Sequence, residues 1–185
     1  MNLFNLTFFI WILSEILLNR LVRSGKSDKR SADKNTELIL WITITISVTA
    51  SVFISKNFSC PIFLQERLEY MGLGLIVSGI IMRFIAIRQL GKFFTVDVTI
   101  RSNHTLMQSG VYRYIRHPSY SGSLLSFLGL GIVLNNWLSL GLVFISVLIA
   151  YIHRMNTEEN LLTGQFGREY ADYIQRTKRI IPLVY

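Results

Sequence analysis

The chain has 185 residues, of which 51% are apolar and only 16% are charged, and its formal net charge is +8. This composition is more apolar and less charged than that of a typical soluble domain, and it favours lipid as the solvent. The Lys and Arg residues lie mainly between apolar blocks, which argues against nucleic acid as a partner and for an anionic membrane surface. The single cysteine, Cys60, excludes a disulfide framework and a cysteine zinc site within the chain.

Five apolar segments follow one another along the chain. A helix needs roughly 20 residues to cross a hydrocarbon core of about 30 Å. We predict helices over residues 3–18, 38–54, 68–87, 121–134 and 137–152. The fourth is short for a full crossing and meets the fifth at Asn135-Asn136, a pair typical of the turn in a helical hairpin. The sequence therefore predicts an all-α integral membrane bundle of about five transmembrane segments.

Glycines in the third and fourth segments predict close contact between helices, because small residues let transmembrane helices approach one another. These glycines are Gly72, Gly74, Gly79, Gly129 and Gly131. The run Gly72-Leu73-Gly74 does not fit a dinucleotide-binding fingerprint, because no strand-turn-helix pattern surrounds it.

The distribution of Lys and Arg predicts which ends of the helices are cytosolic. Residues 20–34 carry six Lys or Arg, whereas residues 55–67 carry only two. Because positive charge is retained in the cytosol, the first connection is predicted inside and the second outside. The N-terminus then starts outside as a retained anchor, and both residues 89–120 and the tail from His153 onward are cytosolic. We expect a multi-pass protein of the plasma (inner) membrane.

The polar stretch between the third and fourth segments is dense in hydrogen-bonding and aromatic side chains. Pro118 biases His117 away from helical backbone angles, and Gly122 permits close packing. Arg116, His117 and Tyr120 are therefore expected on a shaped loop that leads into the hairpin. Polar groups near the membrane need water or partners, which a ligand pocket would supply. Contacts with lipid headgroups are the alternative for an isolated Arg-His pair.

A second group of charged side chains follows the fifth segment. If the helix continues past the membrane, Arg154 and Glu158 lie one turn apart on the same face. They then form either a surface ion pair, worth about 0–1 kcal/mol, or an ionic pocket opposite the loop that carries His117. The spacing alone leaves both possibilities open.

These two groups resemble the signatures of the isoprenylcysteine carboxyl methyltransferase family. The central signature runs from His104-Thr105-Leu106 through Ser109-Gly110-Val111-Tyr112 to Arg116-His117-Pro118-Ser119-Tyr120 and Gly122. The C-terminal signature contains Glu158-Glu159, Phe166-Gly167, Tyr170 and Tyr173, with Pro182 near the end. The resemblance covers roughly residues 89–182.

The resemblance implies a cofactor site and a reacting site. The residues implied to line a pocket for S-adenosylmethionine are His104, Leu106, Tyr112, Arg116, His117 and Tyr120. Arg154 and Glu158 fall where the family places an essential Arg and Glu near the reacting groups, and they are the candidate catalytic residues. The implied fold is a membrane bundle without a Rossmann domain, in which the loop and the C-terminal helix close the donor pocket. No metal is implied.

The implied protein is a methyltransferase of one domain, residues 1–185, with three helices in residues 1–88 and the catalytic core in residues 89–185. Its acceptor is expected to be a lipophilic small molecule or a lipidated group in the bilayer, with a carboxylate favoured as the methylated group. Related membrane families leave open a phospholipid amine or a small thiol as acceptor, a sterol-reductase-like enzyme that uses NADPH, and a non-enzymatic membrane scaffold. The sequence does not indicate the oligomeric state.

Overall fold

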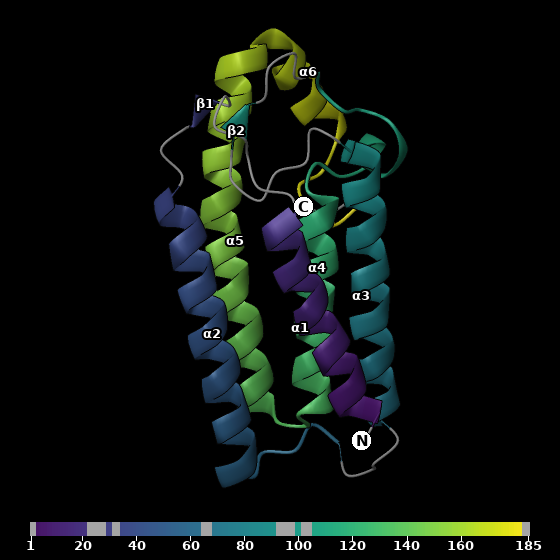
Figure 1. Ribbon diagram of the computed structural model, residues 1–185, viewed down its shortest axis with the longest axis vertical. Coiled ribbons are helices and arrows are strands. Elements are labelled where there is room, and N and C mark those ends of the chain that lie inside the picture. Colours follow the sequence, from purple (N-terminus) through teal and green to yellow (C-terminus); the bar gives the residue numbers. More distant parts are fainter. Residues whose placement is uncertain are drawn as a thin grey trace.

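The computed structural model describes residues 3–21, 29–30, 34–63, 68–91, 99–100 and 105–182. Within these ranges, five long helices form an elongated bundle, and a short helix covers one end (Figure 1). The elements are α1 (Leu3–Leu21), β1 (Lys29–Arg30), α2 (Lys34–Asn57), α3 (Leu68–Leu90), β2 (Thr99–Ile100), the 3-10 helix η2 (Gly110–Arg113), α4 (Pro118–Val133), α5 (Trp137–Phe166) and α6 (Arg168–Arg176).

Each of the five predicted apolar segments is a helix, and the prediction of an all-α membrane bundle is confirmed. Among the described residues, α2, α3 and α5 are long and apolar enough to cross a membrane. α4 has 16 residues, which at a rise of 1.5 Å per residue reach about 24 Å, and the described apolar stretch of α1 is Leu6–Leu17. The chain is therefore an integral membrane protein in which three helices meet the length and composition of a full crossing.

α5 is longer than the sequence predicted. The expected end was residue 152, but the helix continues to Phe166 and has 30 residues, or about 45 Å. Because this length exceeds a hydrocarbon core of about 30 Å, part of the helix projects beyond that core. Arg154 and Glu158 consequently lie on one continuous helix, as the pocket hypothesis requires.

The turn between α4 and α5 is built from the predicted asparagine pair. Asn135 has a φ of 46°, a left-handed conformation that asparagine tolerates better than most residues. The Asn136 side-chain oxygen caps α5 by accepting from two N–H groups of its first turn, and its amide donates to the Phe58 carbonyl over 2.6 Å. The turn is thereby tied to the end of α2, at the lower end of the bundle in Figure 1.

Interlocking glycines bring α3 and α4 into close contact. A Cβ on Gly72 would lie 2.7 Å from the Gly129 carbonyl oxygen. A Cβ on Gly122 would lie 2.6 Å from the carbonyl oxygen of Gly79. These distances are too short for any side chain, so the glycines allow the two backbones to touch. Close packing is confirmed at these positions, but it is wrong for Gly74, which meets no described atom of another element within 4 Å.

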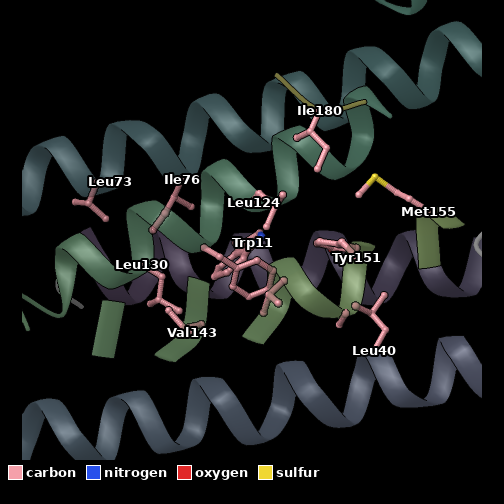
Figure 2. Packing of buried hydrophobic residues seen from close by; sticks show 13 residues of the cluster. Trp11, Leu40, Leu73, Ile76, Leu124, Leu130, Val143, Tyr151, Met155 and Ile180 are labelled. Atoms are coloured by element: carbon pink, nitrogen blue, oxygen red, sulfur yellow. The ribbon is translucent and has the colours of Figure 1, made fainter. Parts of the chain in front are cut away.

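The apolar core lies where α1, α3, α4 and α5 face one another, and Leu40 of α2 also belongs to it (Figure 2). Trp11 of α1 packs edge-on against Phe127 of α4, with ring centroids 4.9 Å apart. α2 joins α5 partly through reciprocal hydrogen bonds, in which the hydroxyls of Ser51 and Ser139 each donate to the carbonyl of the other residue. Ile180 of the C-terminal tail also belongs to this core, so the tail is anchored to the bundle.

A two-residue strand pair, which the sequence did not predict, joins two segments at the end of the bundle that carries α6 (Figure 1). Lys29 of β1 lies opposite Ile100 of β2, and Arg30 lies opposite Thr99, in antiparallel register. Strands this short carry no alternation of apolar and polar residues by which they could be predicted. The pairing places Lys29 and Arg30, which lie between α1 and α2, beside Thr99 and Ile100, which follow α3.

Candidate functional site

The polar loop before α4 is held against the C-terminal tail by backbone hydrogen bonds. The Arg116 N–H donates to the Lys178 carbonyl over 2.8 Å, and the His117 N–H donates to the Arg179 carbonyl over 3.0 Å. Pro118 begins α4, and His117 before it has a φ of −122° and a ψ of 58°. The backbone of His117 is therefore outside the helical region, as the following proline predicted.

Glu159 connects this loop, the tail and α5 through its carboxylate. Its Oε1 accepts from Arg116 Nε over 3.0 Å and lies 3.1 Å from His117 Nε2. Its Oε2 accepts from both Nη2 and Nε of Arg179. Glu159 is buried, with 8% of its surface exposed, and contacts between charged groups strengthen where water is excluded. This carboxylate therefore ties the three segments together.

Glu158, the neighbouring carboxylate, faces a different partner. Its Oε2 accepts from the Tyr120 hydroxyl over 3.0 Å, and the same hydroxyl accepts from Arg154 Nε over 3.0 Å. Arg154 is only 3% exposed, which excludes the surface ion pair that the spacing had left open. His117 Nδ1 lies 3.6 Å from Glu158 Oε2, so the His117 ring stands between the two adjacent carboxylates.

An aromatic stack supports the hydroxyl that Glu158 and Arg154 share. The Tyr120 ring stacks on His117 with centroids 5.5 Å apart and on Tyr151 with centroids 4.8 Å apart. The Tyr151 hydroxyl lies 2.7 Å from the Ser123 hydroxyl on α4. The stack leads from the polar loop into the bundle and restricts the rotation of the Tyr120 ring.

Three buried tyrosines, one on η2 and two on α6, lie at the same end of the bundle as this network. The Tyr173 hydroxyl donates to the Tyr112 carbonyl over 2.6 Å, and burial raises the pKa of Tyr173 to about 12. Burial, followed by the carboxylates of α5, also raises the pKa of Tyr170. The Tyr170 hydroxyl is buried and has no hydrogen-bond partner among the described residues. Both phenols are therefore neutral near pH 7, and the hydrogen-bonding capacity of the Tyr170 hydroxyl is not used by any described residue.

The structure brings most of the predicted site residues together. Arg116, His117, Tyr120, Arg154 and Glu158 form one network, which Glu159 completes. The Tyr112 carbonyl accepts from the Tyr173 hydroxyl, and Tyr173 is linked through Thr177 to Arg116 of the network. Leu106 is partly buried on the segment that leads to η2. His104 lies outside the described residues.

Sequence reasoning missed Glu159 and Arg179 as parts of this network, and it missed an ion pair deeper in the bundle. There Arg83 of α3 donates from Nη2 to Glu15 Oε2 of α1 over 3.0 Å. The signal for this pair was present, because an ionisable residue inside an apolar segment is costly unless it has a partner. The tail contacts of Arg179 leave no comparable local pattern.

The fold and the site define a helical integral membrane protein with a buried ionic network at one end of its bundle. The sequence model of the isoprenylcysteine carboxyl methyltransferase family matches residues 72–164. The chain belongs to this family, and the resemblance stated from the motifs is confirmed.

Similar proteins include two from Arabidopsis thaliana. Protein-S-isoprenylcysteine O-methyltransferase B is 38% identical over 115 residues, which cover 61% of this chain and 58% of that protein. Protein-S-isoprenylcysteine O-methyltransferase A is 31% identical over 172 residues, which cover 80% of this chain and 87% of that protein. The chain spans 58% and 62% of the length of the first two curated relatives that it matches.

A solved structure shares the fold as well. It is that of the eukaryotic intramembrane Ras methyltransferase, isoprenylcysteine carboxyl methyltransferase, with a TM-score of 0.66 at 29% sequence identity. The match covers 78% of this chain and 52% of the other. The family match over residues 72–164 includes Arg83, the polar loop and both carboxylates of α5, whereas α1, α2 and the tail lie outside it.

Proposed function

We propose that this chain transfers a methyl group from S-adenosylmethionine to the carboxylate of a lipophilic, isoprenylcysteine-type acceptor at the cytosolic membrane interface. The observation that carries the proposal is the Tyr120 hydroxyl, which Glu158 and Arg154 share where the polar loop meets the apolar bundle. A carboxylate and a guanidinium are thereby placed together at the end of helices that lie in lipid. Family membership supports the same chemistry.

The residues around this hydroxyl fit S-adenosylmethionine, which combines a sulfonium and an ammonium with a carboxylate and an adenosine. When bound, it supplies an activated methyl group. Glu158, whose side chain is 31% exposed, offers a carboxylate to the cationic part, and the His117–Tyr120 stack offers aromatic faces to it. The buried Tyr170 hydroxyl offers a donor to a carboxylate or ribose oxygen.

The remaining predicted cofactor residues would form the walls of this pocket. Tyr112 and Arg116 lie on the loop side of it and are fixed by α6 and the tail. Leu106 would close it from the segment before η2, and the resemblance assigns His104, outside the described residues, to the same pocket. This assignment follows the family resemblance residue by residue.

In this proposal Arg154 holds the acceptor carboxylate. Charge-assisted contacts between a guanidinium and a carboxylate are among the strongest hydrogen bonds in proteins. A carboxylate is already ionised near pH 7, so no side chain has to remove a proton from the acceptor. The protein then acts mainly by alignment, and proximity and orientation contribute roughly 7–11 kcal/mol in favourable intramolecular systems.

We further propose that residues 1–185 act as one domain, with three helices up to residue 88 and the catalytic core from residue 89. The end that carries the site would face the cytosol of a plasma (inner) membrane, with the N-terminus starting outside. The support is the basic pair Lys29 and Arg30, which lies at the same end as the site (Figure 1). The apolar tail of the acceptor would remain in the bilayer.

Methyl transfer by the purified protein in lipid nanodiscs tests the function. The assay uses radioactive S-adenosylmethionine and an S-prenylated cysteine with a free carboxylate, and the matched control is the corresponding amide. The expected product is a base-labile methyl ester, formed from the acid and not from the amide. A radioactive product that is stable to base would show that the acceptor is a phospholipid amine or a thiol and not a carboxylate. The absence of both methyl transfer and donor binding would overturn the function.

Variants of the same protein test the assigned residues. Arg154→Ala is expected to lower kcat/KM for the acceptor on the order of 100-fold, because removing one partner of a buried ionic contact costs about 3 kcal/mol or more. Glu158→Gln is expected to weaken binding of S-adenosylhomocysteine, measured by calorimetry. Arg113→Ala, which changes an exposed arginine of η2, is the matched control and should behave as the wild type. Wild-type binding and turnover in both Arg154→Ala and Glu158→Gln would remove the assigned roles.

A further inference from the structure

α1 and α3 carry an ion pair inside the apolar part of the bundle, outside the network around Tyr120. Arg83 Nη2 donates to Glu15 Oε2 over 3.0 Å, and Arg83 Nε lies 3.0 Å from Oε1 in ionic contact. The two side chains are 14% and 17% exposed. Glu15 lies within the apolar stretch Leu6–Leu17, and Arg83 lies within the span Glu69–Leu90. Charges at such positions are costly, and where they persist they usually have a function.

Arg83 also reaches the first turn of α4. Its Nη1 donates to the Ser119 hydroxyl over 3.0 Å and to the Ser119 carbonyl over 3.3 Å. The close approach of α3 and α4 makes this possible, because Gly122 leaves room for the Arg83 backbone. A Cβ at position 122 would lie 2.8 Å from Arg83 N. One guanidinium therefore contacts α1 and α4 at the same time.

Ser119 immediately precedes Tyr120, whose hydroxyl is shared by Glu158 and Arg154. Arg83 is also near enough to Tyr120 and Arg154 to interact with both electrostatically. We propose that Arg83, neutralised by Glu15, is a positioning residue that fixes the first turn of α4 and with it the Tyr120 hydroxyl. The effect of Arg83 on turnover rests on the proposed function, whereas its positioning of α4 is independent of that function.

The alternative is that the ion pair serves only to dock α1 on the bundle. The reversed pair Glu15→Arg/Arg83→Glu separates the two roles, because it restores opposite charges between α1 and α3. A glutamate at position 83 cannot donate to the Ser119 carbonyl. If docking is the whole role, the reversed pair should resemble the wild type. If Arg83 positions α4, the reversed pair should keep the thermal stability and lose the fixed turn.

Hydrogen exchange measured by mass spectrometry in nanodiscs reads the first turn of α4 directly, whether or not the chain transfers methyl groups. The reversed pair and Arg83→Lys are expected to raise exchange in residues 118–124 on the order of 10-fold, the effect of losing a charged hydrogen bond to that turn. Exchange in residues 40–54 of α2 should not change. Arg88→Lys, an exposed arginine of the same helix, is the control.

The outcomes distinguish the roles. Wild-type exchange in residues 118–124 of the reversed pair overturns the proposal, and so does an equal rise in α2. If the reversed pair does not fold, Arg83→Lys and Ser119→Ala decide, and wild-type exchange in both overturns the proposal. In the methyl-transfer assay, Arg83→Lys should lower kcat and leave KM for the acceptor unchanged. A wild-type protein without methyl transfer and without donor binding would refute the proposed function, while the exchange result would still decide the positioning.

Discussion

Glu159→Gln is expected to loosen the C-terminal tail from the polar loop. In the wild type, one carboxylate oxygen accepts from Arg116 and lies beside His117 Nε2, and the other accepts from Arg179. Glutamine keeps the size of the side chain and replaces one oxygen by an NH2 group. In either orientation of the amide, a donor faces a donor on one side, and the contacts on the other side lose their charge assistance.

Of the contacts that hold the tail, the substitution weakens the one between Glu159 and Arg179, and the magnitude follows from that contact. Hydrogen bonds to charged groups are worth about 1.5–3 kcal/mol. The Arg179 side chain is only 20% exposed, so solvent screens this contact weakly. At 1.36 kcal/mol for each factor of ten, the open state of the tail should become roughly 10- to 100-fold more populated.

Limited trypsin digestion in nanodiscs, followed by mass spectrometry, measures this opening at Lys178 and Arg179. Glu159→Gln should be cleaved there faster by the factor just given. Glu158→Gln is the matched control, because it makes the same chemical change at the adjacent residue, which accepts from Tyr120. Cleavage at the wild-type rate in Glu159→Gln would refute the reasoning, and so would equal acceleration in both variants.

Gly79→Ala would place a Cβ 2.8 Å from a backbone nitrogen of α4 and should destabilise the protein by about 1–3 kcal/mol. Its thermal midpoint in detergent should fall, whereas the matched Gly74→Ala should not lower it. Asn136→Ala removes the cap of α5 and the hydrogen bond to the Phe58 carbonyl and should cost about 2 kcal/mol, of which Asn136→Ser, a good capping residue without the amide donor, recovers the capping part in the same measurement. The pKa of Tyr173 is raised to about 12 from about 10, so its contribution to stability is complete below about pH 10 and is lost towards about pH 12. Tyr173→Phe should flatten this fall in a pH series of thermal midpoints, and an unchanged slope would contradict it.

The bundle could be predicted from the sequence because each helix leaves a local pattern. Five apolar runs, the Asn135-Asn136 turn and the paired glycines all correspond to observed features. The length of α5 could not be predicted in the same way, because the helix continues past residue 152 as a polar segment without the apolar pattern. The loss of apolar character marks where a helix leaves lipid, which need not be where the helix ends.

The site was predictable in part for the same reason. Pro118 acts on its neighbour His117 through local sterics, so the shape of the loop could be inferred. The hydrogen bond between Arg116 of this loop and Lys178 joins residues 62 positions apart and leaves no periodic trace in either segment. Arg83 and Glu15 are recognisable in the sequence as charged residues within apolar segments, but only the structure shows that they form an ion pair with each other.

The adjacent carboxylates Glu158 and Glu159 have different roles because successive residues of an α-helix point about 100° apart. One carboxylate could not accept from the tail and also reach the Tyr120 hydroxyl, whereas two neighbours on one helix do both. The His117 ring lies between them, 3.1 Å from an oxygen of Glu159 and 3.6 Å from an oxygen of Glu158. Displacement of the tail is therefore expected to reach the Tyr120 hydroxyl through the His117 ring, which would make docking of the tail a condition for the proposed methyl transfer.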